Sequence, residues 1–200
     1  MAMEGEFRAP VQVVDFASRY LSSFLTQAGG FAIHWSLGIP SRWQVPPPIY
    51  VKLNFDGATL MGGVQVGVGV VARDELGRCV AWLSRRVERT GDGELAESLA
   101  AREAVLLALQ KCWPRVIVEG DYAVLIQKLQ QKKRDLSTYD PIVADILSFS
   151  SCIPSCQFSL VRRSGNTVAH FFAHYCNDFA EGEHLIPTVV VSLVSSDIAK

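Results

Sequence analysis

The chain lacks several features that mark common classes of protein. It has no excess of basic residues, since 19 Lys and Arg stand against 20 Asp and Glu, so the positive field typical of sequence-independent nucleic-acid binders is missing. No apolar run is long enough to cross a bilayer, because the apolar stretch 185–194 is short and contains a proline. We therefore expect a soluble protein with no membrane partner.

Cysteine is scarce and irregularly spaced. Five cysteines without a secretory leader fit a reduced intracellular compartment better than a disulfide framework. Cys152 and Cys156 resemble half of a zinc site, but no second Cys/His pair follows at finger-like spacing. Glu4, Glu6 and Asp15 fit neither a secretory nor a transit peptide. We expect an intracellular protein of the nucleus or cytoplasm, not a secreted one.

The basic residues that are present fall into three groups, each of which a solvated surface explains. The groups are Arg85, Arg86 and Arg89; Lys132, Lys133 and Arg134; and Arg162 and Arg163.

Length and composition allow one well-cored domain with extensions, and we expect a monomer. Apolar residues between Val14 and Leu25 recur at helical spacing. The run Pro46-Pro47-Pro48 is typical of a stiff linker. We predict three parts: an N-terminal amphipathic helix with a proline-rich linker (1–50), a folded domain (51–180) and a C-terminal tail (181–200) whose segment 187–194 has strand-like composition.

The first half of the domain has strand patterns. Apolar residues alternate from Val51 to Phe55, and Asp56-Gly57-Ala58 breaks the run, which predicts a strand that ends in an acid. Strands over 64–72 and 79–83 flank a turn at 74–77, so three strands form an antiparallel meander. Gly67 and Gly69 inside the second strand indicate a bulge or a close backbone approach.

The second half alternates between helices and strands. The predicted elements are a helix over 95–109, a strand over 115–119, a helix from 121, a helix over 141–149, a strand over 157–161 and a helix over 166–179. This order predicts an α/β fold with a five-stranded mixed sheet, in which three antiparallel strands are followed by parallel strands and helices cover both faces. Trp82 and Trp113 are expected to pack in the core.

Three acids stand at the ends of predicted elements. Asp56 ends the first strand, Glu97 lies in the first turns of the first long helix, and Asp121 directly follows the fourth strand. Carboxylates that meet at strand ends repel one another unless a cation holds them. Hard oxygen ligands favour Mg²⁺ or Mn²⁺, and two such ions about 4 Å apart can activate water in phosphodiester hydrolysis.

Each acid also has a simpler explanation. Asp56 precedes a glycine and could serve a turn. Glu97 could be solvated or interact with the helix dipole. Asp121 could cap the next helix. Their joint placement in this order of elements favours the metal site.

Five segments in this order together resemble the ribonuclease H domain: KLNFDGA (52–58), GVGVVARDELG (67–77), LAESLAAREAVLLAL (95–109), VIVEGD (116–121) and RRSGNTVAHFFA (162–173). The chain looks most like the reverse-transcriptase-like form that is abundant in plants, in non-LTR retroelements and as free-standing genes. The likeness covers most of 51–179, and the helix and proline run before it also resemble plant members. The resemblance implies a ribonuclease H-like fold.

The resemblance also implies an activity. Asp56, Glu97 and Asp121 match the first three catalytic acids of the family, which bind two Mg²⁺ ions and cut the RNA strand of an RNA–DNA hybrid. It thus implies a nucleic-acid-binding, metal-dependent endonuclease of the ribonuclease H type, with Mg²⁺ as the cofactor and Mn²⁺ as an alternative.

The fourth acid position departs from the family's pattern. The last helix usually carries Asp after Asn-x-x-Ala, whereas His170 follows Asn166-Thr167-Val168-Ala169 here, as in many plant members. His170 thus takes the fourth catalytic and metal-ligating position by resemblance, while a lone histidine on an apolar helix is also explained by packing. Neutral imidazole brings no negative charge, so the ion should be held more loosely and Mn²⁺ tolerated better.

Two other functions remain open. One is a nucleic-acid-binding domain that keeps the fold but has lost efficient turnover, which His170 and the low basicity favour. The other is a domesticated, retroelement-derived scaffold that binds protein partners. His174 lies one turn after His170, but no third ligand for a histidine pair is evident, and we expect His174 to pack.

Overall fold

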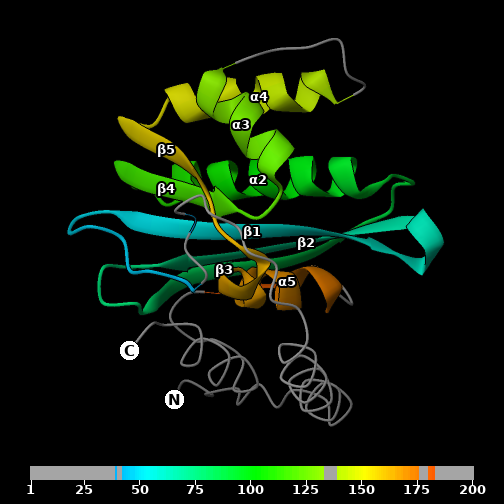
Figure 1. Cartoon of the computed structure of the whole chain (residues 1–200), viewed down its shortest axis with the longest axis horizontal. Coiled ribbons are helices and arrows are strands. Elements are labelled where there is room, and N and C mark those ends of the chain that lie inside the picture. The colour runs from blue at the N-terminus through cyan, green and yellow to red at the C-terminus, as the bar shows by residue number, and fades with distance from the viewer. Residues whose placement is uncertain (1–38, 40–41, 133–138, 176–179, 183–200) are drawn as a thin grey trace, which may run out of the picture.

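A computed structural model of the chain describes residues 39, 42–132, 139–175 and 180–182. Within these ranges, six strands form one mixed sheet, and helices cover both of its faces (Figure 1). The helix expected over 14–25 and the strand-like stretch 187–194 lie outside the described residues. No described helix is both long and apolar enough to span a membrane.

The elements follow one another in the order β1 (Val51–Leu60), η1 (Met61–Gly63), β2 (Gln65–Arg73), β3 (Cys79–Val87), α2 (Gly93–Gln110), β4 (Arg115–Gly120), α3 (Ala123–Gln131), α4 (Asp140–Ser151), β5 (Ser155–Leu160), η2 (Arg163–Gly165), α5 (Thr167–His174) and β6 (Ala180–Gly182). The strand order across the sheet is β5-β4-β1-β2-β3-β6. β1, β2 and β3 are antiparallel neighbours, whereas β4 and β5 run parallel to β1. The predicted five-stranded mixed sheet is confirmed, and β6 adds a short edge strand beside β3.

β1 is longer than the sequence pattern predicts. We expected it to end at Asp56, but β1 pairs with β2 as far as Leu60. A Cβ atom at Gly57 would overlap the backbone of Ala96 and Glu97. Glycine is therefore needed here because α2 packs directly on the strand, and not because the chain turns. Asp56 lies inside β1, so both the strand end and the turn explanation are wrong.

The opposite face of the sheet has a similar close approach. A Cβ atom at Gly69 would overlap the backbone of Ala169 and Ala173 in α5. Gly69 is also the cross-strand partner of Asp56, and the missing side chain lets α5 lie directly against the strand next to this acid. Of the two alternatives for the glycines of β2, a close approach is the one found at Gly69. α5 ends at His174, earlier than the expected limit near 179.

The main core lies between the sheet and α2, α3 and α4 (Figure 1). Asp92 caps α2, since its side chain accepts a hydrogen bond from the Leu95 backbone N–H at 3.0 Å. The helix then presents buried alanines to the sheet: Ala96, Ala100, Ala104 and Ala108. Trp113 packs against this core. Trp82 stacks on Phe172 in a smaller core beneath α5, with ring centroids 5.1 Å apart, so both tryptophans pack as predicted.

Candidate metal centre

Asp56, Glu97 and Asp121 come together, with ligand oxygens that all lie within 4.8 Å of one another. The register of the sheet brings Asp56 and Asp121 together. Asn54 of β1 is paired with Glu119 of the parallel strand β4. Asp56 and Asp121 follow two residues later in each chain segment, so they face the same side. Glu97 joins them because α2 packs on Gly57.

The simpler explanations of Glu97 and Asp121 do not hold. Glu97 is 9% exposed, so it is not a solvated helix residue. The acid in the first turn of α2 is Glu94, so Glu97 lies beyond the turn in which the helix dipole acts. Asp121 does not cap α3, because the N-cap position is Tyr122 and no side chain caps this helix.

The three carboxyl groups are buried close together, which disfavours their charged forms. Burial is the main cause that raises the pKa of each, to about 6 for Asp56 and about 9 for Glu97. The charges of Asp56 and Asp121 raise the pKa of Glu97 further. Among the described residues, Asp56 Oδ1 and Glu97 Oε2 are buried without a hydrogen-bond partner. Buried carboxylate oxygens that lack donors and repel one another fit a hard divalent cation such as Mg²⁺ or Mn²⁺.

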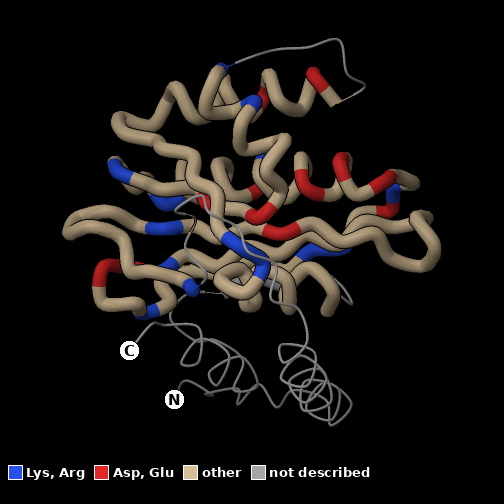
Figure 2. The backbone as a smooth tube through the Cα atoms, viewed as in Figure 1, with Lys and Arg blue, Asp and Glu red and all other residues tan. Residues whose placement is uncertain are grey.

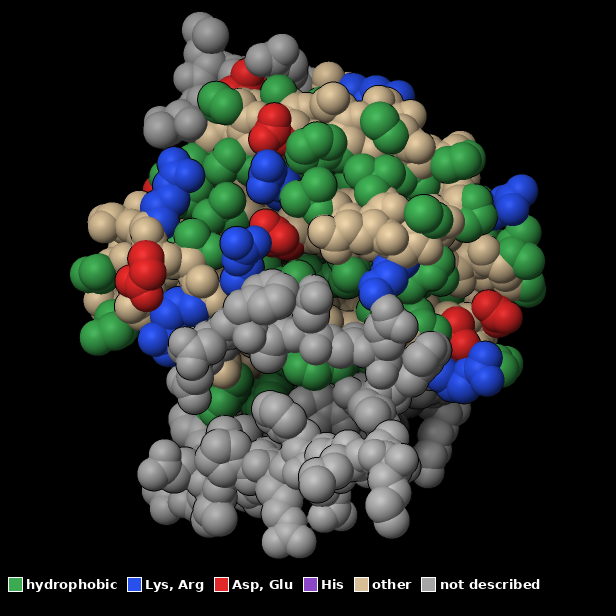
Figure 3. Space-filling model, turned by 180° about the vertical axis from the view of Figure 1, so that it is seen from behind, with side chains coloured by type: hydrophobic (Ala, Val, Ile, Leu, Met, Phe, Trp, Pro, Cys, Tyr) green, Lys and Arg blue, Asp and Glu red, His purple; other side chains and the backbone are tan. Residues whose placement is uncertain are grey.

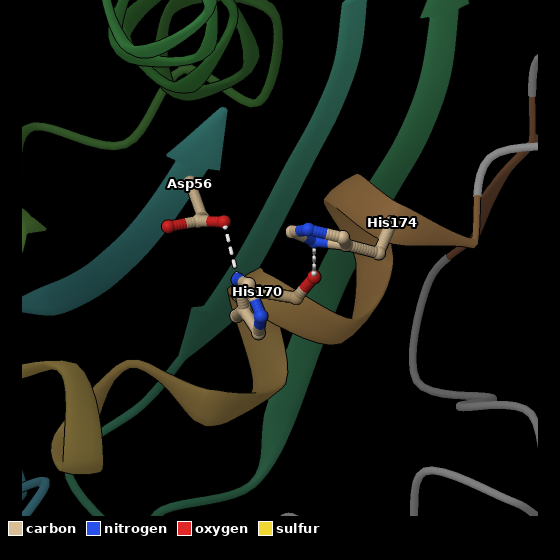
Figure 4. A group of neighbouring side chains, drawn as sticks. All are labelled: Asp56, His170 and His174. Carbon is tan, nitrogen blue, oxygen red and sulfur yellow. Dashed lines mark hydrogen bonds and ion pairs between the residues drawn. The ribbon is translucent and has the colours of Figure 1, made fainter. Parts of the chain in front are cut away.

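His170 lies beside this acid cluster. Its Nδ1 atom is 2.9 Å from Asp56 Oδ2 (Figure 4), and its side chain is buried. Desolvation, followed by the positive charge of Arg163, lowers the pKa of His170 to about 4. His170 is therefore neutral near pH 7, and its contact with Asp56 is a hydrogen bond rather than an ion pair.

Arg163 is a site residue that the sequence analysis placed only in a basic run. One guanidinium nitrogen lies 3.1 Å from His170 Nδ1, and another lies 3.6 Å from Asp121 Oδ2. The signal that could have singled it out is its position just before α5, the helix that carries His170. Of the other basic groups, Arg85 pairs with Glu103, while Lys133 and Arg134 lie outside the described residues.

A buried hydrogen-bond network centred on Asn54 and Asn166 lies next to the three acids. Asn166 donates hydrogen bonds to the Phe55 carbonyl at 2.8 Å and to Asp121 Oδ1 at 3.5 Å. Asn54 donates to Glu119 at 3.0 Å and to Asn166 at 3.3 Å. The network therefore ties the positions of β1, β4 and the start of α5 to one another.

Trp43, Lys52 and Arg73 extend this polar network on the side of Asn54 and Glu119. Arg73 donates to Asn54 Oδ1 at 3.0 Å, and its guanidinium lies 3.7 Å from the centre of the Trp43 ring. Lys52 forms an ion pair with Glu119 at 3.1 Å. Trp43 and Arg73 are fully buried. Trp43 thus belongs to the packed structure although it precedes Val51.

Basic residues are dispersed on the face of the molecule seen in Figure 3. Lys and Arg lie on several elements of the backbone (Figure 2). On the face seen in Figure 3, they stand as separate patches among hydrophobic and acidic side chains. A nucleic acid would therefore meet local contacts here rather than a broad positive field.

The fold and the acid cluster can be compared with known proteins. A family model described as reverse transcriptase-like matches residues 54–176. This chain belongs to the reverse transcriptase-like family. The match contains all four predicted site residues of this reverse transcriptase-like protein: Asp56, Glu97, Asp121 and His170. Among curated proteins, no sequence matches the chain.

Solved structures with a similar fold include several ribonucleases H. RNase H1 from the archaeon Halobacterium salinarum NRC-1 has a TM-score of 0.58 at 21% identity, covering 62% of this chain and 95% of that one. LC11-RNase H1, isolated from compost, was solved in complex with an RNA/DNA hybrid and has a TM-score of 0.56 at 21% identity, covering 62% and 94%. An N-terminal RNase H domain from Mycobacterium tuberculosis has a TM-score of 0.57 at 16% identity, covering 62% of this chain and 91% of that one. The reverse transcriptase-like protein therefore has the ribonuclease H-like fold.

Proposed function

We propose that this reverse transcriptase-like protein is a metal-dependent endonuclease that hydrolyses the RNA strand of RNA–DNA hybrids. The observation that carries the proposal is the convergence of ligand oxygens of Asp56 in β1, Glu97 in α2 and Asp121 just after β4 within 4.8 Å of one another. A purely structural role does not explain this clustering of acids, because burial and repulsion from the other two carboxylates raise the pKa of Glu97 to about 9.

Each residue has a distinct role in this proposal. Asp56, Glu97 and Asp121 hold divalent metal, and His170 offers a nitrogen at the fourth ligand position. The bound metal supplies an activated water and a counter-charge for the leaving oxygen. Glu97 gives up its proton before it binds metal, because its pKa lies above neutral pH. Arg163, whose side chain is 61% exposed, can turn from Asp121 towards a phosphate of the substrate.

The fold relatives support the choice of substrate. LC11-RNase H1, which shares the fold, is described in complex with an RNA/DNA hybrid. The reverse transcriptase-like family match, together with the motifs from KLNFDGA to RRSGNTVAHFFA, supports an origin in a retroelement of the plant, non-LTR type. We propose that origin together with the activity, and a domain that extends over 51–180.

A cleavage assay tests the proposal. Purified protein, a hybrid labelled on its RNA strand, and Mg²⁺ or Mn²⁺ should give shorter RNA, and Asp56→Asn should abolish the cleavage. The matched control is Asp145→Asn, because Asp145 is an exposed acid on α4 that pairs with Arg102; this variant should cleave like the parent. Cleavage that survives in Asp56→Asn rejects the assignment.

One observation favours a second candidate, a hybrid-binding domain with weak turnover. The fourth ligand position carries the neutral His170, which contributes no negative charge to a cation. In this case the protein binds the hybrid without cutting it, binding weakens with salt, and His170→Asp restores cleavage.

A further inference from the structure

A second group of potential metal ligands adjoins the acid cluster. Asp56, His170 and His174 each offer one ligand atom, and these atoms lie within 4.8 Å of one another. The two histidines come from successive turns of α5, and Asp56 faces them from β1 (Figure 4). From the sequence, the histidine pair had no third ligand, and the structure places Asp56 at that position.

We propose that Asp56, His170 and His174 form a nitrogen-rich metal site that selects a borderline cation, such as Zn²⁺ or Co²⁺, over Mg²⁺. The site shares Asp56 with the acid cluster. It goes beyond the proposed nuclease activity, because His174 has no part in that activity and the binding does not depend on turnover.

The tautomer of His174 suits metal binding. Its Nδ1 atom lies 3.0 Å from the backbone carbonyl oxygen of His170 (Figure 4). A carbonyl oxygen only accepts hydrogen bonds, so Nδ1 carries the proton and Nε2 of the neutral ring keeps its lone pair. Histidines that ligate metals are commonly oriented in this way, by donating the other ring nitrogen to a carbonyl.

The charges around the site act in both directions. Both imidazoles reach the site from successive turns of α5, and each can ligate a cation through a ring nitrogen that carries no proton. Asp56 supplies negative charge, and a cation bound at His170 Nδ1 would take the place of the proton that Nδ1 donates to Asp56. That proton would move to Nε2 of the same ring, so the imidazole stays neutral. Arg163 opposes binding by its positive charge, but its side chain is 61% exposed and can withdraw into water.

The donor set determines the selectivity. Mg²⁺ prefers oxygen ligands and octahedral geometry, whereas imidazole nitrogens favour Zn²⁺ and its neighbours in the first transition row. His174 is exposed, so an ion can enter from solvent on that side. Because Asp56 belongs to both groups, a cation on the histidines withdraws a ligand from the acid cluster. Zn²⁺ should therefore antagonise Mg²⁺ at that cluster.

A cobalt titration tests the site without any cleavage. The parent for this experiment is Glu97→Gln, which disables the acid cluster but leaves Asp56, His170 and His174 unchanged. Co²⁺ added to this variant should give visible d–d absorption bands, and Zn²⁺ in stoichiometric amount should abolish them. Millimolar Mg²⁺ should leave the bands in place, because Mg²⁺ prefers oxygen ligands. Adding His174→Gln should weaken Co²⁺ binding on the order of tenfold or more.

Three results would overturn the proposal. The first is equal Co²⁺ affinity with and without His174→Gln, after circular dichroism has shown that both proteins are folded. The second is displacement of Co²⁺ by millimolar Mg²⁺. The third is an intense near-ultraviolet thiolate band, which would put the ion on a cysteine such as the exposed Cys112 or Cys152. A failed nuclease assay leaves all three readouts intact, so the two proposals fail separately.

Discussion

His170 Nδ1 lies 2.9 Å from Asp56 Oδ2, although 114 residues separate the two in the chain. The contact joins α5 to the middle of β1. It places a neutral imidazole where a fourth carboxylate would complete the ligand set for a hard cation.

His170→Asp should therefore increase Mg²⁺-supported cleavage of a hybrid, on the order of tenfold. The added carboxylate supplies the negative charge that imidazole lacks. The measurement is the initial cleavage rate as a function of Mg²⁺ concentration, with the neutral His170→Asn as the matched control. A rate for His170→Asp no higher than that of His170→Asn would show that charge at this position does not limit the reaction.

Glu97→Gln should raise the thermal stability at alkaline pH. The pKa of Glu97 is about 9 in the folded protein, against an ordinary value of 4.5. Between these values the unfolded chain has lost a proton that the folded protein retains, so the free energy of unfolding falls as pH rises. Glutamine does not titrate, so the melting temperature of the variant should exceed that of the parent by roughly 3 °C or more at pH 8.

The difference between the two proteins should disappear near pH 4, where Glu97 is protonated in both states. Calorimetric scans between pH 4 and pH 9, without divalent metal, measure this trend. A constant difference across that range would mean that packing, and not ionisation, governs the effect of Glu97→Gln.

Local patterns were sufficient to predict the architecture. The alternation from Val51 to Phe55 and the alanine-rich segment after Leu95 specify their own elements, because each pattern reflects which face is buried. The end of β1 was not predictable in this way. Gly57 looks like a turn residue in sequence, whereas its role depends on α2, which approaches it from a part of the chain 40 residues away.

Gly57→Ala should destabilise the fold by about 1–3 kcal/mol, or more if α2 cannot shift. The added Cβ atom would overlap backbone atoms of Ala96 and Glu97. Backbone atoms cannot move aside by a change of rotamer, so the helix itself would have to shift. Gly93→Ala is the matched control, since nothing lies within 4 Å of a Cβ atom there and alanine favours a helix. Urea unfolding of both variants measures the difference. Equal midpoints would argue against direct packing of α2 on β1.

Asn166→Ala should destabilise the protein by about 1–3 kcal/mol, because it leaves the buried Phe55 carbonyl without this donor. It should also weaken binding of divalent metal, since Asn166 helps to orient Asp121. Gln130→Ala is the control: Gln130 also donates to a backbone carbonyl, but in an exposed position, and its loss should change stability by less than about 0.5 kcal/mol. Unfolding and Mn²⁺ titration of both variants test this, and similar losses in the two would refute the role of Asn166.

The site was only partly predictable. Asp56, Glu97 and Asp121 could be selected because each adjoins a recognisable element. Lys52 and Asn54 alternate with apolar residues and look solvent-facing, yet both are buried. Their burial depends on α5 and on Trp43, which come from distant parts of the chain. Arg163 and His174 gave too weak a signal, since basic runs and histidines on helices are common. Only the fold brings Arg163 next to Asp121 and His174 next to Asp56.

Strand-specific cleavage tests the central claim most directly. One sequence is prepared as an RNA–DNA hybrid, duplex RNA and duplex DNA, with each strand labelled in turn, and is incubated with the protein and Mg²⁺ or Mn²⁺. We expect cuts in the RNA strand of the hybrid alone, and none with Asp56→Asn. An RNA strand that stays intact in the hybrid at every metal concentration, with both the natural protein and His170→Asp, would contradict the account.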